Sequence, residues 1–114
     1  KDICDIYLPV AHAEGKFVAQ NNDVLGEMES AGQLVLRYSG DGKGIGQSLP
    51  YPANPNGSMA NVAGVCDKSG RAFGLMPHPE RCVHPTQHPR WTRETQTSGA
   101  GLDIFRNAVS YLSN

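Results

Sequence analysis

Two prolines that flank a single histidine constrain the backbone of this chain more tightly than any other feature of its sequence. They stand in the stretch "GLMPHPER", residues 74–81, directly after an apolar run. Proline fixes its own φ and disfavours helical backbone at the residue before it, so Pro79 keeps His78 out of a helix. Side chains two residues apart in an extended chain point to the same side. We therefore expect His78 and Glu80 to project together from the end of a strand.

A histidine beside a carboxylate suits general-base chemistry. The carboxylate fixes the tautomer of the imidazole and stabilises the imidazolium, and the other ring nitrogen stays free to take a proton from a nucleophile. Two such side chains make up two thirds of a catalytic triad, so His78 and Glu80 are our candidate catalytic residues. The alternative is a surface hydrogen bond in a proline-kinked loop, which is the common fate of a His-x-Glu sequence by itself.

The glycine and proline content of the chain predicts long loops. Its 114 residues suffice for one modest domain, or for a piece of one. Residues 39–58 and 84–101 show no helical or strand periodicity, and segments of that kind are usually functional or mobile. The glycines of "GDGKGIG", residues 40–46, match neither the dinucleotide-binding nor the P-loop spacing. We expect a flexible insertion there and no cofactor bound to this chain.

Short regular elements are predicted between these loops. Residues 3–10 are rich in β-branched and aromatic types and favour a strand that stops at Pro9. A short helix follows, with Asp23 as its N-cap and Gly32 as its stop. Apolar and other side chains then alternate over residues 34–38, which indicates a second strand.

The second half of the chain predicts a hairpin and a closing helix. Two apolar runs, residues 61–66 and 71–76, are joined by the polar turn "DKSG". The last helix is expected to begin at about Leu102, with Asp103 in its positively polarised first turn. Its apolar stripe consists of Leu102, Phe105, Val109 and Leu112.

Charge, hydropathy and cysteine content limit the partners. Lysine and arginine number 10 against 11 acidic residues, for a net charge of −1, so nucleic acid is not an expected partner. No apolar stretch approaches the ~20 residues that cross a bilayer, and we expect a soluble, cytoplasmic protein. Three widely spaced cysteines predict reduced thiols. His78, His84, His88 and Cys82 fit no zinc-ligand spacing, so no metal site is expected.

Four blocks of the sequence together resemble one enzyme family. They are "LPVAHAEGKFV", "NPNGSMANVAGVCDKSGRAFG", "GLMPHPER" and "GLDIFRNAV", and they span nearly the whole chain in order. The resemblance is to the C-terminal half of the class I (triad) glutamine amidotransferases. Within that class the chain is most similar to the glutaminase subunit of phosphoribosylformylglycinamidine synthase, because the "AHAEGKF" and "NPNGS" blocks narrow the match.

The resemblance implies a fold and a chemistry. The fold is a doubly wound, flavodoxin-like α/β sandwich, of which this chain would supply the C-terminal half. The family triad is Cys-His-Glu, and its histidine and glutamate match His78 and Glu80. The cysteine attacks the side-chain amide of glutamine, and the released ammonia passes to a partner synthetase. That synthetase uses ATP and Mg²⁺ to aminate formylglycinamide ribonucleotide in purine biosynthesis.

The nucleophile is where the sequence departs from the family. The family cysteine stands in a Gly-x-Cys-x-Gly elbow, and Cys4, Cys66 and Cys82 lack those glycines, so we interpret all three as structural or incidental. Residues 1–114 are therefore expected to be the C-terminal portion of a single amidotransferase domain without its nucleophile half. Such a piece should be inactive alone and should expose apolar edges and faces. The alternatives are a non-catalytic module that docks to a synthetase, or an amidotransferase that serves a different synthetase.

Two further features carry open interpretations. The usual family sequence His-Gly-Glu-Gly reads His12-Ala13-Glu14-Gly15 here, and a left-handed backbone at Ala13 would be strained. His12 and Glu14 either contact glutamine or the synthetase, or form a solvated turn. A tryptophan among arginines suits an interface with the synthetase or an aromatic lid on the core, and this group comprises Arg81, Arg90, Trp91 and Arg93.

Overall fold

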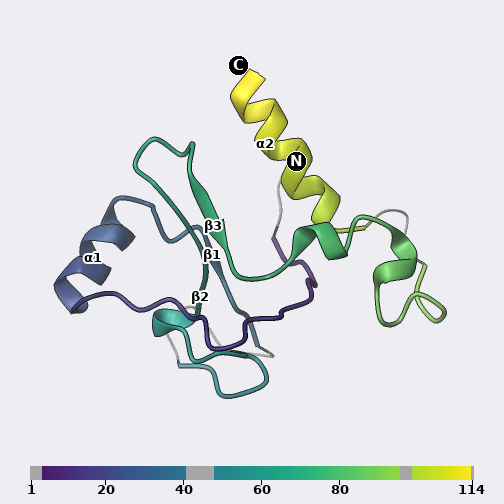
Figure 1. The fold of residues 1–114 in the computed structure, drawn as a ribbon, viewed down its shortest axis with the longest axis horizontal. Coiled ribbons are helices and arrows are strands. Elements are labelled where there is room, and N and C mark those ends of the chain that lie inside the picture. Colours follow the sequence, from purple (N-terminus) through teal and green to yellow (C-terminus); the bar gives the residue numbers. More distant parts are fainter. Residues whose placement is uncertain (1–3, 41–47, 96–98, 114) are drawn as a thin grey trace. The chain divides into compact units, whose positions relative to one another are not determined.

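The computed structural model describes residues 4–40, 48–95 and 99–113 and divides the chain into two compact units. The sheet unit comprises residues 12–76, and the helix unit comprises residues 1–11 together with 77–114. In order along the chain the elements are α1 (Asn22–Ser30), β1 (Leu36–Arg37), β2 (Val62–Cys66), β3 (Phe73–Leu75) and α2 (Gly101–Ser113), with three short 3-10 turns (Figure 1). The described elements form a small α/β fold with an antiparallel sheet.

The sheet is built on the hairpin that the sequence predicts. β2 lies between β1 and β3, and both pairings are antiparallel. Gly64, at the middle of β2, pairs with Leu75 and with Leu36. A Cβ on Gly64 would lie 3.0 Å from the Leu75 side chain and 3.2 Å from that of Leu36, so a glycine here lets the neighbouring side chains close over the central strand.

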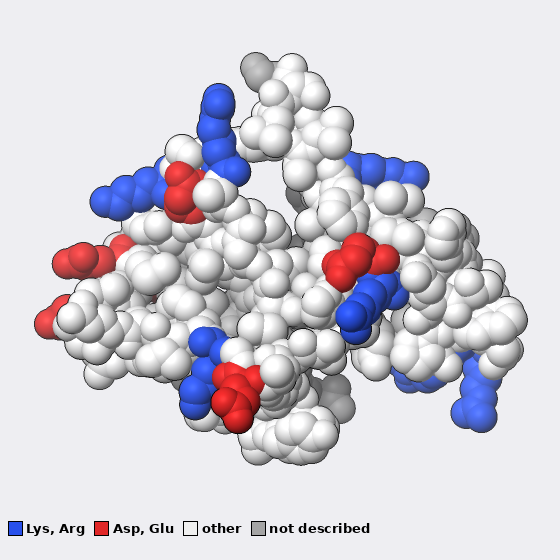
Figure 2. Space-filling view, in the orientation of Figure 1, with Lys and Arg blue, Asp and Glu red and all other residues white. Residues whose placement is uncertain are grey.

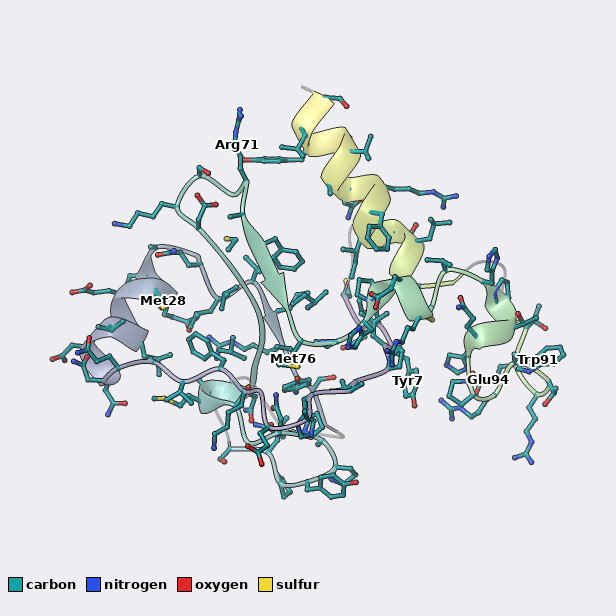
Figure 3. The ribbon with its side chains drawn as sticks, in the orientation of Figure 1. Tyr7, Met28, Arg71, Met76, Trp91 and Glu94 are labelled. Atoms are coloured by element: carbon teal, nitrogen blue, oxygen red, sulfur yellow. The ribbon has the colours of Figure 1, made fainter. Side chains whose placement is uncertain are left out.

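The turn between β2 and β3 is organised by one carboxylate. Asp67 accepts hydrogen bonds from the backbone N–H groups of Ser69, Arg71 and Ala72 at 2.9–3.2 Å and from the Ser69 hydroxyl at 2.6 Å. These bonds, chiefly that from the Ser69 hydroxyl, lower the pKa of Asp67 to about 2. Gly70 supplies the positive φ of 70° that the turn requires. Arg71 projects outward from this end of the hairpin (Figure 3).

Helix α1 forms where it was expected, with one correction at its start. The N-cap is Asn21, whose Oδ1 accepts from the Val24 N–H at 2.9 Å, and Asp23 lies in the first turn. The prediction of Asp23 as the cap was wrong because two neighbouring residues can both cap, and Asn21 has the extended backbone that a cap needs. Gly32 ends the helix with φ 68°, as predicted. The strand expected over residues 34–38 is present as the two residues of β1.

Asn54, Ser58 and Asn61 form a buried polar cluster in the sheet unit, directly before β2. Each of the three is at most 6% exposed. Asn54 Nδ2 donates to Asn61 Oδ1 at 3.1 Å and to the Ser58 carbonyl at 3.0 Å, and the Leu49 N–H donates to Asn61 Oδ1 at 3.1 Å. The cluster precedes the buried first residue of β2, Val62, so it fixes how the chain enters the central strand.

The strand predicted over residues 3–10 does not form in the part that the structure describes. In residues 4–10 the one ladder contact is an isolated bridge between Val10 and Pro77, next to which the His78 N–H donates to the Pro9 carbonyl at 2.8 Å. Pro9 and Pro77 both lack the N–H that would extend a ladder, which is why the pairing stops after one step.

Helix α2 begins at Gly101, one residue before the predicted start, and carries the predicted apolar stripe. Much of that stripe is uncovered: Phe105 is 42% exposed, Val109 66% and Leu112 60%. Asp103, in the first turn, is buried and lies 3.5 Å from the Arg106 guanidinium. The helix unit therefore presents an apolar helix face to solvent.

The two long loops are described in part. Residues 41–47, which hold most of the glycine-rich insertion, and residues 96–98 lie outside the described residues. Within residues 48–58, turns and bends cover 51–56, and residues 84–95 form a 3-10 turn at Pro85–Gln87 followed by further turns. None of the described helices has the length and apolarity to span a bilayer. On the face shown in Figure 2, acidic and basic side chains are interspersed.

Candidate functional site

The structure brings the two predicted site residues together in the helix unit. His78 Nδ1 and Glu80 Oε1 lie 2.6 Å apart, and the two side chains are 31% and 56% exposed. The geometry differs from the extended step that the sequence indicated. His78 is extended, with φ −103° and ψ 90°, but Pro79 opens a 3-10 turn over Pro79–Arg81. The expectation of an extended Glu80 was wrong because proline is also well suited to the first position of a helical turn.

The contact between the two side chains affects the charge state of the carboxylate. The hydrogen bond from His78 is the main cause that lowers the pKa of Glu80, so the carboxylate stays ionised at neutral pH. Stability from this bond is complete above the ordinary pKa of a glutamate and is lost as the pH falls through the lowered value. Because Nδ1 is engaged by the carboxylate, Nε2 is the ring nitrogen left to exchange a proton with a reacting group.

Backbone hydrogen bonds hold the step on both sides. The His78 N–H donates to Pro9, and the His78 carbonyl accepts from the Arg81 N–H at 3.1 Å. The Cys82 N–H donates to the Pro79 carbonyl at 3.0 Å, and the Cys82 carbonyl accepts from the Gly101 N–H at 2.9 Å. Nothing in the sequence indicated the bond between Gly101 and Cys82, because this bond joins residues about 20 positions apart through backbone atoms alone.

None of the three cysteines occupies a strand-to-helix elbow in the described structure. Cys82 follows the 3-10 turn and is 2% exposed, Cys66 ends β2 ahead of the Asp67 turn, and Cys4 lies in an irregular exposed segment. These positions fit the interpretation of all three as structural or incidental: Cys82 is buried, whereas Cys4 is exposed. That the nucleophile comes from outside residues 1–114 stays a prediction.

Two sequence blocks quoted for the family resemblance meet in the sheet unit. Asn56 Nδ2 donates to the Gly15 carbonyl at 3.0 Å, the Phe17 N–H donates to Ser58 Oγ at 3.1 Å, and the Met59 N–H donates to the Phe17 carbonyl at 3.0 Å. Gly15 and Phe17 are thus bonded to residues 56–59, and Ser58 among these belongs to the polar cluster. No local pattern in the sequence indicated these bonds, because they join residues about 40 positions apart.

The turn at residues 12–15 has the strain anticipated from its alanine. Ala13 has φ 48°, in the left-handed region, and the Gly15 N–H donates to the His12 carbonyl at 2.7 Å. Glu14 is exposed. His12 Nδ1 is buried, and among the described residues it has no hydrogen-bond partner. His12 is therefore partly enclosed, unlike a fully solvated turn residue, while its functional contacts stay a prediction.

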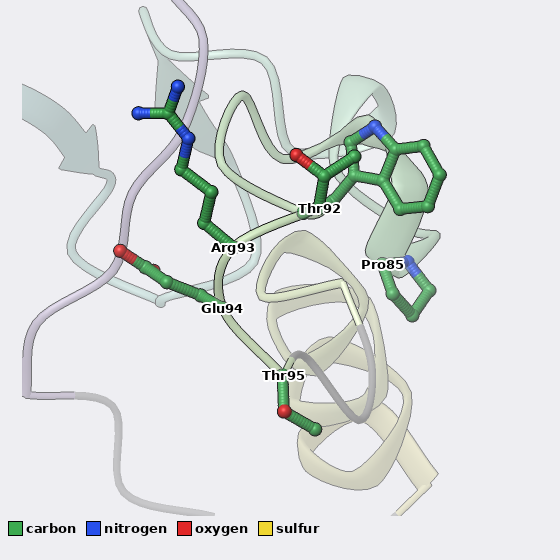
Figure 4. A pocket seen from close by; sticks show the side chains of 6 residues that line it. Pro85, Thr92, Arg93, Glu94 and Thr95 are labelled. Atoms are coloured by element: carbon green, nitrogen blue, oxygen red, sulfur yellow. The ribbon is translucent and has the colours of Figure 1, made fainter.

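Two members of the arginine and tryptophan group, Trp91 and Arg93, line a shallow pocket. The pocket has a volume of about 300 Å³ and is lined by residues 91–95 and by Pro85, which stands across it from Arg93 and Glu94 (Figure 4). Arg90 Nε lies 3.1 Å from Glu94 Oε1. Trp91 is 51% exposed, so about half of its surface is covered, and the alternative of an aromatic lid on the core stays open. The expected contact with a synthetase stays a prediction.

A second, more enclosed cavity of about 210 Å³ adjoins Cys82. Asp5, Tyr7, His84 and His88 are among its lining residues. The Tyr7 ring meets the His88 ring edge-on at 5.0 Å, and His88 Nδ1 accepts from the Arg90 N–H at 3.2 Å. Within residues 4–40, 48–95 and 99–113, no three histidine, cysteine or acidic side chains are grouped so as to bind a metal ion.

Comparison with known proteins places these features in a family. A family model described as the CobB/CobQ-like glutamine amidotransferase domain matches residues 1–112. The similar proteins include three that are each named phosphoribosylformylglycinamidine synthase subunit PurQ. The protein from Dehalococcoides mccartyi is 48% identical over 93% of this chain and 39% of its own length. The one from Archaeoglobus fulgidus is 42% identical over 98% and 39%, and the one from Methanococcus maripaludis is 36% identical over 99% and 45%.

These matches run along nearly all of the chain, although the chain spans only about two fifths of the length of the relatives. The His-Pro-Glu step, the turn at residues 12–15 and the polar cluster all lie within the matched region. The chain therefore belongs to the CobB/CobQ-like glutamine amidotransferase domain family.

Proposed function

We propose that this chain carries the base and the orienting carboxylate of a glutaminase, as the C-terminal part of an amidotransferase domain with a doubly wound α/β fold. The observation that supports the proposal most directly is the 2.6 Å contact between His78 Nδ1 and Glu80 Oε1. The position of both residues within the matched family region adds to it. The nucleophilic cysteine belongs to a segment outside residues 1–114, so the isolated chain is inactive.

The proposed reaction assigns one role to each group. A thiol of the missing segment loses its proton to His78 Nε2 and attacks the side-chain amide carbon of glutamine. His78 then returns the proton to the departing nitrogen, which leaves as ammonia, and a glutamyl thioester remains. Water, activated by the same nitrogen, hydrolyses the thioester to glutamate and free thiol. Glu80 holds the imidazole in the required tautomer and stabilises the imidazolium.

The destination of the ammonia is proposed from the relatives. Each of those described above is named as a subunit of phosphoribosylformylglycinamidine synthase, which supports a synthetase partner of that kind. The partner would use ATP and Mg²⁺ to aminate formylglycinamide ribonucleotide, and this chain would bind neither. Co-purification of the natural protein would identify the partner, and a synthetase of another pathway would redirect the proposal to a different acceptor.

The size of the natural polypeptide tests the proposed division of the domain. We expect the intact mass in source cells to be well above the 12.3 kDa of these residues. A natural mass of 12.3 kDa would contradict the proposal, because the triad could not then be completed within one chain.

Substitution of the pair in the intact subunit tests the chemistry. We expect His78→Ala to lower kcat for glutamine hydrolysis by at least about 100-fold, because the proton acceptor is lost. Glu80→Ala is expected to lower kcat less, by at least about 10-fold, since it orients the base and does not itself transfer the proton. His84→Ala is the matched control, being an exposed histidine that follows the same step. Near-normal turnover of His78→Ala would show that the triad assignment is wrong.

A further inference from the structure

The start of helix α2 approaches the His-Pro-Glu step so closely that only glycine fits. A Cβ built on Gly101 would lie 2.7 Å from the carbonyl carbon of Pro79 and 2.8 Å from its Cα, and closer still to its carbonyl oxygen. A Cβ on Gly99 would lie 2.6 Å from the carbonyl carbon of Cys82. Every atom opposed to these positions belongs to backbone, and the backbone of Pro79 is further restrained by its ring.

The approach is directional as well as close. The Gly101 N–H donates to the Cys82 carbonyl at 2.9 Å, and the Cys82 N–H donates to the Pro79 carbonyl at 3.0 Å. The atoms nearest to Gly101 include the carbonyl group of Pro79, so the peptide that Gly101 contacts is the one that joins Pro79 to Glu80. The side chain of Glu80 is 56% exposed, so its position depends on this backbone more than on side-chain packing.

We infer that Gly101 is a positioning residue for the catalytic pair, and that the first turn of α2 holds the Pro79–Glu80 peptide where Glu80 reaches His78 Nδ1. The catalytic role of the pair rests on the proposed function, whereas the contact between Gly101 and Pro79 does not depend on it. Ordinary carbon contacts lie at about 3.5–4.0 Å, so a methyl group at position 101 displaces the Pro79 backbone by roughly 0.7 Å or more. Displacements of about 1 Å in a catalytic constellation cost about 100-fold in rate.

The test compares two glycine-to-alanine variants of the intact subunit. Gly101→Ala adds a methyl group against Pro79, whereas Gly26→Ala adds the same group within α1. There, apart from its chain neighbours and the nearby helix backbone, no atom of the described residues lies within 4 Å of the new carbon. We expect Gly101→Ala to lower kcat for glutamine by about 10- to 100-fold with KM within about twofold. Gly26→Ala should keep both constants. Unchanged kcat in Gly101→Ala would overturn the inference.

A spectroscopic readout separates this inference from the proposed function. The proton that His78 Nδ1 shares with Glu80 should give a proton resonance downfield of the backbone amides, assigned by its loss in Glu80→Gln. We expect Gly101→Ala to lose or shift this resonance and Gly26→Ala to keep it. Should the wild-type subunit show the resonance but no glutaminase activity, the proposed function fails while the positioning role stands. A resonance that persists unchanged in Gly101→Ala overturns the positioning role, whatever happens to turnover.

A measurement on the unmodified protein covers the case in which Gly101→Ala does not fold. The Gly101 and Cys82 amides should be protected from hydrogen exchange in the wild-type subunit, because each donates to a backbone carbonyl within this contact. Exchange of both amides at the rate of an unstructured loop would rule out the contact on which the inference depends.

Discussion

Single residues with a left-handed backbone show where this chain tolerates strain. Ala13, Ala60 and Asn61 have φ values of 48°, 51° and 57°. Asparagine adopts this conformation with little penalty, whereas the Cβ of alanine clashes with the following carbonyl group at a cost of roughly 1–2 kcal/mol. Ala13 and Ala60 both lie in segments fastened to the polar cluster of Asn54, Ser58 and Asn61, so tertiary contacts hold them in place.

Replacing Ala13 by glycine should relieve part of this strain. The gain in the folded state is roughly 1–2 kcal/mol, and the extra entropy of glycine in the unfolded chain opposes it by roughly 0.5–1 kcal/mol. We expect Ala13→Gly to raise the free energy of unfolding by about 0.5–1 kcal/mol, measured by urea denaturation.

Ala31 provides the matched control for this prediction. It is exposed at the end of α1 with φ −82°, so Ala31→Gly adds the entropy of the unfolded chain and relieves no strain. This variant should be destabilised. Equal effects of the two substitutions would mean that the left-handed turn at Ala13 stores no strain.

Elements were predictable wherever a local pattern governs them. The β2–β3 hairpin follows from two apolar runs and a turn with a late glycine, and α2 follows from an apolar stripe and its glycine entry. The strand expected over residues 3–10 failed because residue composition does not reveal that Pro9 and Pro77 both face the pairing edge. The proximity of His78 and Glu80 was predicted correctly, but on the basis of an extended backbone at Pro79. The structure has a 3-10 turn there, because proline supports a turn as readily as an extended conformation.

The hairpin turn gives a prediction with a defined pH dependence. The pKa of Asp67 lies at about 2 in the folded chain, below its ordinary 3.8. The contribution of this carboxylate to stability is therefore complete above about pH 4 and is lost as the pH falls through about 2. We expect Asp67→Asn to lower the melting temperature at neutral pH, because one of the two acceptor oxygens is lost, and this difference should close as the pH approaches 2.

NMR titration of the Asp67 carboxyl group checks the cause directly, and Asp5→Asn serves as the charge-matched control outside the hairpin. A midpoint for Asp67 near 3.8 would contradict the hydrogen-bonded turn. A melting-temperature difference between wild type and Asp67→Asn that does not vary between pH 2 and pH 7 would contradict it equally.

For the whole molecule, the limits of sequence reasoning lie in contacts between distant segments. The bonds from residues 54–61 to residues 15–17 span about 40 positions, and the contact of Gly101 with Pro79 spans about 20. Periodicity and turn chemistry act over a few residues, so no local pattern could reveal either contact. The candidate pair itself was accessible because His78 and Glu80 are two residues apart.

The uncovered stripe of α2 predicts how residues 1–114 behave when they are expressed alone. With Val109 66% and Leu112 60% exposed, the helix presents an apolar face of the kind that drives association. We expect concentration-dependent self-association in sedimentation velocity, reduced when both residues are replaced by lysine. Ser110→Lys, on another face of the same helix, should leave it unchanged. A wild-type chain that stays monomeric at high concentration would contradict this prediction.

The contact between Gly101 and Pro79 also bears on the order in which a ribosome makes this protein. The His-Pro-Glu motif emerges some 20 residues before the turn of helix that supports it. The motif is therefore synthesised before the residues that position it. A product that ends before Gly99 would contain the complete sequence "PHPE" but would lack the contact from Gly101. An intact motif in a truncated or spliced transcript therefore does not by itself indicate a supported pair, because residues 99–101 belong to the site as much as the motif does.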